Sequence, residues 1–255
     1  MVSSEKIAEL LFEFSNPSRL DILMLIKEKS IKPSQLARSA DQTIQETSRH
    51  LQRLTKALLV ERDSNGAYSL TPFGKQMLAL IPEIHFLAIN SEYFATHDLS
   101  CIPPQFRYGL GLIREYNTAS HVMEAFQQSE DLIRNSEEII WIHSDQILAS
   151  TLPLIEEAVQ RGVEFRVILP KELGSQGPHL EPFPNIVRNR NSLTHDRFIE
   201  SVQLVIVMSE KKALLAFPTK DGCPDYLGFA LSNDAGLKWC KELFLHFWNQ
   251  SESWE

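Results

Sequence analysis

Residues 43–58 constrain the fold of this chain most strongly, because apolar side chains recur along them with the period of an α-helix. Successive members of the stripe lie three or four residues apart, and they are Ile44, Thr47, Leu51, Leu54 and Leu58. This spacing predicts one buried helix face. The opposite face is polar, which indicates a helix that packs on a core and presents its outer side to water or to a polar partner.

Three helices and a turn are predicted before this segment. The first covers Ser4–Phe14, with apolar side chains on one face. Asn16 is placed as the N-cap of a second helix, which begins at a proline and ends near Lys29. A short third helix over Pro33–Ala40 leads into a turn at residues 39–42. The polar-faced helix is therefore expected directly after a helix and a tight turn.

A hairpin and another helix are predicted after it. Asn65-Gly66 lies between two short runs of β-forming residues, which is a strong hairpin signal. Thr71-Pro72 opens a helix that is expected to run to about Phe94, with a break at Pro82. Helix, turn, polar-faced helix and hairpin in this order predict a winged helix-turn-helix, in which the polar-faced helix enters the DNA major groove.

The outer face of the helix supplies candidate DNA contacts. The residues expected near the bases are Thr43, Gln45, Glu46, Ser48, Arg49 and Gln52. Phosphate contacts are expected from Arg49, Arg53 and Lys56, and from Arg62 beside the hairpin. The alternative is a solvated helix face, and the agreement of helix, turn and hairpin signals favours DNA.

The charge distribution is compatible with DNA although the net charge of the whole chain is −8. Residues 1–90 carry 11 Lys and Arg against 10 Asp and Glu, whereas residues 91–255 carry 14 against 23. The acidic excess therefore belongs to the second part of the chain.

The second part has a mixed pattern. Buried-strand runs at 138–142 and 163–169 flank a helix at 152–161, which predicts a parallel strand pair. Further elements are a helix at 120–135, a loop at 174–184, a hairpin of 203–208 with 213–217, a strand at 226–231 and a closing helix at 234–249. We expect a winged helix-turn-helix at 1–75, a helical linker and dimerisation segment at 76–119, and an α/β effector-sensing or regulatory domain at 120–255.

Several segments resemble known regulators. Residues 15–23, 47–54 and 71–74 resemble winged-helix transcription regulators of the ArsR/MarR superfamily. Residues 93–104, together with 228–231 and 239–244, resemble archaeal methanogenesis regulatory proteins of the FilR type. This resemblance implies a C-terminal α/β domain similar to a degenerate phospholipase-D-like fold.

The phospholipase-D likeness raises an enzymatic alternative, a phosphodiesterase or nuclease. That chemistry needs a His-x-Lys-x4-Asp motif. Starting at His195, the later positions hold Arg197 and Val202, and alignment on the hairpin places Val202, Leu204 and Ser209 there instead. Neither register supplies the motif, so we expect no catalytic residues. An RNA-binding or protein-bridging adaptor is a third possibility.

A tentative ligand site follows the strands of the second domain. His143 and Asp145 come directly after one strand and Lys171 after the next, at the edge where parallel sheets gather ligands. Arg188 and Arg190 are candidates for anion recognition. The alternative is that these residues cap helices and form surface ion pairs.

The remaining sequence features set the cellular context. The three cysteines lie far apart and no histidine pattern suits a metal, so reduced thiols and no metal or cofactor are expected. No apolar run is long enough to span a bilayer, and the N-terminus lacks a signal-peptide pattern. Together these features predict a cytoplasmic, dimeric, DNA-binding transcriptional regulator whose partners are double-stranded DNA, a second copy and a small-molecule effector.

Overall fold

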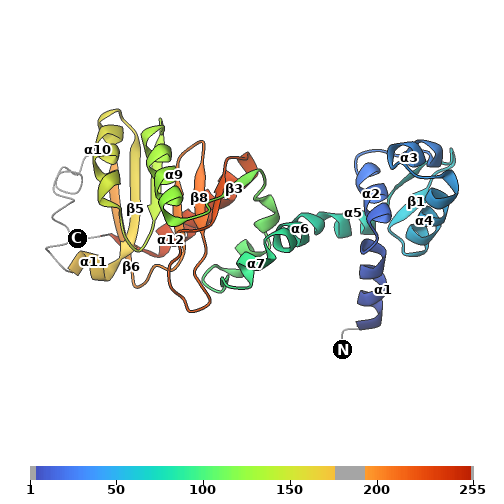
Figure 1. Ribbon diagram of the computed structural model, residues 1–255, viewed down its shortest axis with the longest axis horizontal. Coiled ribbons are helices and arrows are strands. Elements are labelled where there is room, and N and C mark those ends of the chain that lie inside the picture. The colour runs from blue at the N-terminus through green and yellow to red at the C-terminus, as the bar shows by residue number, and fades with distance from the viewer. Residues whose placement is uncertain (1–3, 176–192, 254–255) are drawn as a thin grey trace. The chain divides into compact units, whose positions relative to one another are not determined.

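The computed structural model describes residues 4–175 and 193–253. The chain divides into two compact units, Met1–Pro82 and Glu83–Glu255, whose elements are labelled in Figure 1. The predicted fold class is confirmed: the first unit is a winged helix-turn-helix and the second is an α/β domain. Among the described residues, no helix has the length and apolar character needed to cross a membrane.

The first unit consists of short helices packed around a two-stranded wing. Its elements in chain order are α1 Ser4–Phe14, α2 Pro17–Leu25, α3 Pro33–Ser39, α4 Ile44–Lys56, β1 Val60–Arg62, β2 Tyr68–Leu70 and α5 Pro72–Ala79. Strands β1 and β2 are antiparallel, and Ile31 forms a β-bridge with Tyr68 at the edge of the wing. The core contains fully buried side chains from α2, α3, α4 and the residues just after α4, among them Ile22, Leu36, Leu51, Leu54 and Leu59.

Local capping explains where these helices begin. The side chain of Asn16 accepts a hydrogen bond from the backbone N–H of Arg19 at 3.0 Å, as expected of an N-cap. Thr71 does the same for α5 through the N–H of Gly74, at 2.9 Å. Between α3 and α4 the chain turns through Asp41, whose φ of 51° lies in the left-handed region that Asp tolerates better than most residues.

Two expectations for the first 94 residues were wrong in detail. Ile44 and Leu58 were assigned to the buried stripe, yet they are 60% and 68% exposed. Leu58 lies beyond the end of α4 and has a φ of 61°, so the chain has already left the helical path there. The helix after Thr71 ends at Ala79, and α6 Ile81–Ile89 and α7 Ser91–Phe94 follow. Pro82 therefore lies in the first turn of α6, where its missing N–H costs no hydrogen bond.

The second unit is built on a single eight-stranded sheet in the order β10-β6-β5-β4-β7-β8-β9-β3. Its strands are β3 Tyr116–Thr118, β4 Ile139–His143, β5 Glu164–Pro170, β6 Thr194–Ile199, β7 Val205–Met208, β8 Ala213–Ala216, β9 Phe229–Leu231 and β10 Glu252–Ser253. The predicted parallel pair, β4 with β5, and the predicted hairpin, β7 with β8, are both confirmed. Strand β6 continues the parallel part of the sheet, whereas β7, β8, β9 and β3 are antiparallel.

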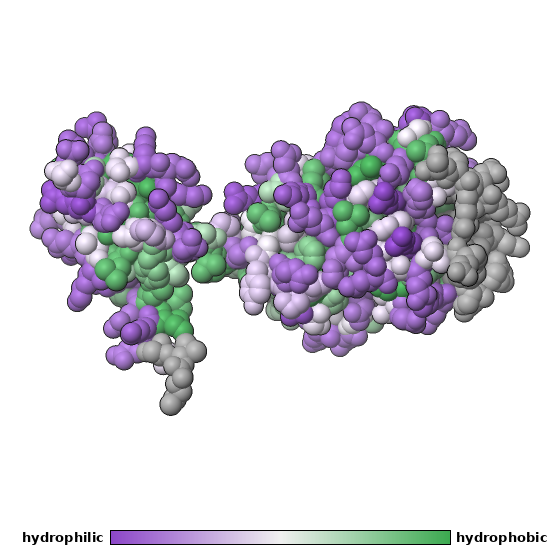
Figure 2. Space-filling view, turned by 180° about the vertical axis from the view of Figure 1, so that it is seen from behind, coloured by the Kyte–Doolittle hydropathy of each residue, from purple (hydrophilic) through white to green (hydrophobic). Residues whose placement is uncertain are grey.

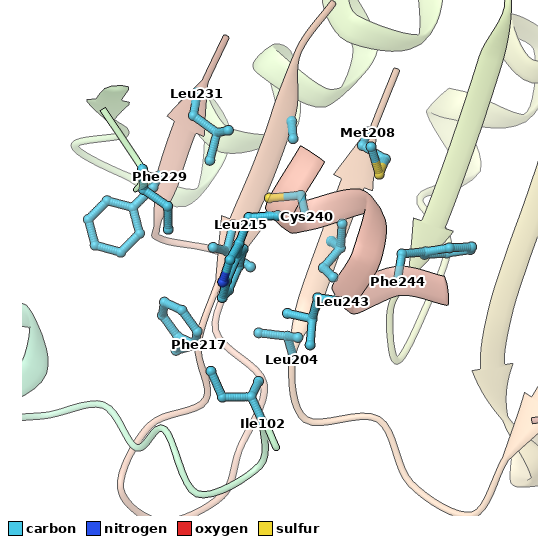
Figure 3. Close-up of a cluster of buried hydrophobic side chains, with 14 of the residues drawn as sticks. Ile102, Leu204, Met208, Leu215, Phe217, Phe229, Leu231, Cys240, Leu243 and Phe244 are labelled. Carbon is cyan, nitrogen blue, oxygen red and sulfur yellow. The ribbon is translucent and has the colours of Figure 1, made fainter. Parts of the chain in front are cut away.

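Helices cover both faces of this sheet (Figure 1). One face packs against α9 Val122–Arg134 and α10 Leu152–Gln160. The other packs against α12 Asp234–Gln250, and Figure 3 shows Cys240, Leu243 and Phe244 of α12 among strand side chains such as Met208 and Leu215. Side chains of successive β4 residues point to opposite faces of the sheet. Because helices cover both faces, this strand is buried almost throughout.

The segment expected to be a separate linker, 76–119, is divided between the two units. Residues beyond Pro82 belong to the second unit, because Phe86, Ile102, Leu110 and Ile113 are buried in the same cluster as the α12 face of the sheet. The ring of Phe86 packs tilted against that of Phe229 in β9, with centroids 5.1 Å apart. Short helices and loops from 83 to 113 therefore form part of the α/β domain's own core.

One close approach gives a test of the first unit's packing. A Cβ added at Gly74 would lie 2.0 Å from the carbonyl oxygen of Leu59. Because backbone stands in the way, we expect Gly74→Ala to destabilise the protein by about 2–3 kcal/mol. Chemical denaturation followed by circular dichroism measures the change, and the exposed neighbour Lys75→Ala should stay within about 0.5 kcal/mol of wild type. Equal stability of the two variants would contradict this packing.

Candidate nucleic-acid interface

Helix α4 begins with a complete capping box. Thr43 Oγ1 accepts a hydrogen bond from the backbone N–H of Glu46 at 3.2 Å, and the Glu46 carboxylate accepts one from the backbone N–H of Thr43 at 3.1 Å. Thr43 Oγ1 also donates to that carboxylate at 2.7 Å, and these bonds hold the pKa of Glu46 below its usual value. Thr43 and Glu46 were expected near DNA bases, and the structure uses both side chains to fix the start of the helix.

The exposed face of α4 carries a row of uncommitted polar side chains. Gln45, Arg49, Gln52 and Lys56 are all exposed and follow one another at spacings of four, three and four residues. Ser48 is half-buried at the edge of this row. Neither Arg49 nor Lys56 forms an ion pair with any residue in the described ranges. Both cations therefore face solvent without an ion-pair partner among the described residues, although Arg49 lies close enough to Glu46 to help lower the pKa of that carboxyl group.

Arg53 is exposed, but its guanidinium forms an ion pair within the first unit. Its Nη2 lies 2.7 Å from Oε1 of Glu13 in α1, and the other carboxylate oxygen lies 3.0 Å from Nε of Arg19. Glu13 is 8% exposed, and its carboxylate raises the pKa of Arg53 above the usual arginine value. Both guanidinium groups also lie over the ring of Phe12, 5.2–5.3 Å from its centroid. One carboxylate thus serves two arginines, and Arg53 joins α4 to α1.

Arg62 is the last residue of β1 and precedes the turn of the wing. The side chain of Asp63 accepts hydrogen bonds from the backbone N–H groups of Asn65 and Ala67, both at 2.8 Å. Gly66 completes the turn with a φ of 79°. Arg62 is exposed, and its guanidinium lies over the ring of Tyr68 on the opposite strand, 6.0 Å from the centroid. No carboxylate in the described part of the chain pairs with it, so its charge is available to an anion.

The tentative ligand residues of the second unit do not form one site. His143 is buried on the α12 side of the sheet, where its Nδ1 lies 2.7 Å from the carbonyl oxygen of Leu204 and its ring stacks on Phe247. Lys171 contacts the carboxylates of Glu200 at 2.7 Å and Glu252 at 3.1 Å. No hydrogen bond or ion pair within the described ranges joins His143, Asp145 and Lys171. Arg188 and Arg190 lie outside the described residues.

Asp145 has a partner that no sequence pattern indicated. The hydroxyl of Tyr226 donates a hydrogen bond to Asp145 Oδ1 at 2.7 Å, and the side-chain amide of Gln146 donates to the same hydroxyl. Burial, together with this bond to a carboxylate, raises the pKa of Tyr226 above its usual value. Tyr226 lies 81 residues from Asp145 in the sequence. Strands β7 and β8 lie between β4 and β9 in the sheet, so the loop after β4 and the segment before β9 meet only in the tertiary structure.

The residues considered for phospholipase-D chemistry do not form a catalytic set in the structure. His195 is exposed on β6, and Arg197 donates a hydrogen bond to the carbonyl oxygen of Trp248 at 2.7 Å. Val202 and Leu204 are buried apolar residues, and the buried Ser209 hydroxyl accepts hydrogen bonds from the backbone of its own turn. In the register that starts at His195, a histidine and a cation are present, but Val202 stands where the carboxylate is needed. The hairpin register has none of the three groups.

Comparison with known proteins finds likeness at the level of fold. No family model matches the chain, and no curated protein matches it. Among solved structures it is similar to TrmBL2, an archaeal chromatin protein, with 15% identity and a TM-score of 0.47 over 99% of this chain and 100% of that one.

Two further structures are each similar to part of the chain. The winged helix-turn-helix domain of Mb0332 from Mycobacterium bovis, a possible ArsR-family regulator, has 21% identity and a TM-score of 0.31 over 34% of this chain and 84% of that one. Nuc from Salmonella typhimurium, a phospholipase D family member, has 12% identity and a TM-score of 0.43 over 55% of this chain and 99% of that one. At these low values, the activities of those proteins are not transferred to this chain.

The buried His143 makes stability depend on pH. Burial lowers its pKa to about 4, and Nε2 has no hydrogen-bond partner among the described residues, so the ring is neutral with its proton on Nδ1 toward Leu204. An unfolded histidine titrates near 6.5, so between about pH 6.5 and 4 the unfolded chain binds a proton that the folded chain does not. The contribution is fully present above pH 6.5 and is lost as the pH falls.

We therefore expect His143→Gln to weaken the pH dependence of the unfolding free energy by about 1 kcal/mol per pH unit over this range. Denaturant titrations at a series of pH values measure it. The exposed His85→Gln is the control, since it also removes an imidazole. Identical pH profiles for wild type and His143→Gln would show that this ring is not held neutral.

Proposed function

We propose that this protein is a sequence-specific, DNA-binding transcriptional regulator that acts as a dimer. The observation that carries the proposal is the exposed row on α4, in which two unpaired cations, Arg49 and Lys56, alternate with two amides, Gln45 and Gln52. Cations at this spacing suit phosphates, and glutamine and arginine side chains suit base edges in the major groove. The wing supplies a further cation at Arg62.

The structure changes which residues we assign to DNA. Gln45, Ser48, Arg49, Gln52, Lys56 and Arg62 remain proposed contacts. Thr43 and Glu46 are proposed to act indirectly, by fixing the start of α4, and Arg53 by joining α4 to α1. A guanidinium paired with Glu13 would lose that pair if it turned to a phosphate, and Arg19 alone would then pair with this largely buried carboxylate.

A second copy is the proposed partner of α1. Ile7 and Leu11 lie one helical turn apart and are 46% and 52% exposed, although α1 otherwise packs on the core through Leu10 and Phe14. Figure 2 shows apolar surface along this part of the first unit. A single winged helix covers few base pairs, so two copies related by a two-fold axis give the usual operator geometry. The proposed partner of this apolar surface is therefore the α1 helix of a second copy.

The α/β domain is proposed to sense an effector, and the resemblance of residues 93–104 to FilR-type regulators belongs to this part of the proposal. The enzymatic alternative has less support, because the buried Val202 stands where the carboxylate is needed and Arg197 donates a hydrogen bond to the carbonyl oxygen of Trp248.

The DNA interface is tested with charge-removing variants. We expect Arg49→Ala and Lys56→Ala together to weaken operator binding about tenfold or more, and to reduce the slope of log affinity against log salt by about one per lost phosphate contact. Binding is measured by mobility shift at several salt concentrations, on DNA selected from genomic fragments. Lys238→Ala, which removes an exposed charge from the second unit, is the control. Unchanged affinity in the double variant would exclude α4 as the recognition helix.

The dimer is tested on α1. We expect Leu11→Glu to convert the dimer to a monomer, because a charge would replace an apolar contact at the two-fold axis. Light scattering after size-exclusion chromatography gives the mass. Lys6→Glu places the same side chain at an exposed position on the far side of the helix, roughly 140° around it from Leu11, and should leave the dimer intact. A Leu11→Glu protein that stays dimeric would show that α1 is not the interface.

A further inference from the structure

A cavity of about 60 Å³ lies between α9 and the face of the sheet that α9 covers. Its inner wall is apolar and includes Ile133 of α9, Ile142 of β4, and Val205 and Val207 of β7. A buried water needs about 10–15 Å³ on this measure, so the space as it stands accepts roughly four water-sized groups. A ligand the size of a benzene ring fits only if it also displaces side chains at the open side of the cavity. Well-packed interiors contain few voids of this size, which makes the cavity a candidate site.

One group of polar side chains lines the cavity near the carboxyl end of β4, and it consists of Ser144, Gln146 and Tyr226. Gln128 and Ser129 of α9, and Thr151, add polar groups elsewhere in the lining. Ser144 is 4% exposed, yet its hydroxyl lies 3.4 Å from both the Asp145 carboxylate and the Gln146 N–H, so its hydrogen bonds are long. This hydroxyl is therefore in a position to form a shorter bond with a ligand.

Hydrogen bonds between distant segments border the open side of the cavity. Tyr226, from the segment before β9, bonds to Asp145 and Gln146 in the loop after β4. Its ring also packs edge-on against Phe126 of α9, with centroids 5.4 Å apart. Gln146 is exposed and Tyr226 half-buried, so this cluster borders the side on which the cavity is open to solvent. A molecule that enters must displace or replace these contacts.

The lining sets the charge of the ligand. No acidic, basic or histidine side chain is among the lining residues in the described part of the chain. An ion placed there would lose its hydration without gaining an opposite charge, at a cost of several kcal/mol. Anion recognition by arginine or lysine, which the sequence suggested for this domain, has no support at this cavity.

We propose that the cavity binds a small uncharged organic molecule, apolar over most of its surface, whose single hydroxyl or carbonyl group bonds to Ser144 and Tyr226. As an effector site this rests on the proposed regulatory function, but occupancy of the cavity does not. Because the molecule would replace contacts of Tyr226, it would act on the loop after β4 and the segment before β9 together.

The experiment titrates the full-length protein, without DNA, with phenol and with benzoate. The two probes are similar in size and differ in charge at neutral pH. Methyl NMR follows Ile133, Ile142, Val205 and Val207, all in the cavity wall. We expect phenol to shift these methyl signals saturably and benzoate to bind at least about tenfold more weakly. Equal binding of the two probes, or phenol shifts confined to other methyl groups, would overturn the proposal.

Two variants control for folding and location. Ser129→Leu fills the cavity from α9 and should weaken phenol about tenfold or more, whereas Gln127→Leu, exposed on the same helix and outside the lining, should not. Should Ser129→Leu fail to fold, Tyr226→Phe keeps the ring but removes the hydroxyl, and phenol should then dissociate several-fold faster. Unchanged phenol binding in Ser129→Leu and unchanged phenol release in Tyr226→Phe would overturn the assignment.

A parallel mobility shift separates this proposal from the proposed function. Loss of all DNA binding with intact phenol binding would remove the regulator proposal and leave the cavity assignment standing. Intact DNA binding with no phenol in the cavity would remove the cavity assignment and leave the regulator proposal standing. A change in DNA affinity on adding phenol, absent in Ser129→Leu, would join the two.

Discussion

Burial of one face of α4 against the rest of the first unit determines which side chains this helix can present to a partner. Thr47, Leu51 and Leu54 are at most 1% exposed, and their packing fixes the rotation of the helix about its own axis. The row from Gln45 to Lys56 then faces outward as a geometric consequence. The capping box at Thr43 fixes where the helix starts, and the Arg53–Glu13 pair joins it to α1. Recognition and stability are thus assigned to different sides of one helix.

The arginines of α4 show how the same residue type takes two roles. Arg49 and Arg53 lie four residues apart, and both were expected to bind phosphate. Arg53 meets a carboxylate that is largely buried, and Glu13 needs cationic partners because burying a lone charge is costly. Arg49 has no such neighbour and keeps its charge for solvent or an anion. The difference arises from α1, which lies 40 residues earlier in the sequence than Arg53.

In the second unit the sheet separates two environments. The α12 side is closely packed with aromatic rings, and Figure 3 shows part of this cluster. The buried His143, whose pKa is lowered, lies on the same side and stacks on Phe247. The α9 side leaves a cavity whose wall is apolar and whose rim is polar. Because residues of β4 alternate between the two sides, His143 and Ser144 are chain neighbours in different surroundings. Residues that adjoin in sequence are therefore a poor guide to which residues share a site in this domain.

The sequence by itself determined the elements that have strong local signals, because helix periodicity, N-caps and an Asn-Gly turn act over a few residues. Strands β3, β6 and β10 were not among them. The limits of α1, the caps at Asn16 and Thr71, the parallel β4–β5 pair and the β7–β8 hairpin all follow from such local signals. Tertiary structure decided which polar residues are free. The commitment of Arg53 to Glu13, the isolation of His143, the pairing of Tyr226 with Asp145 and the cavity they adjoin all join segments far apart in the chain. Short-range periodicity carries no information about such contacts, since they exist only once sheet order and helix packing have formed.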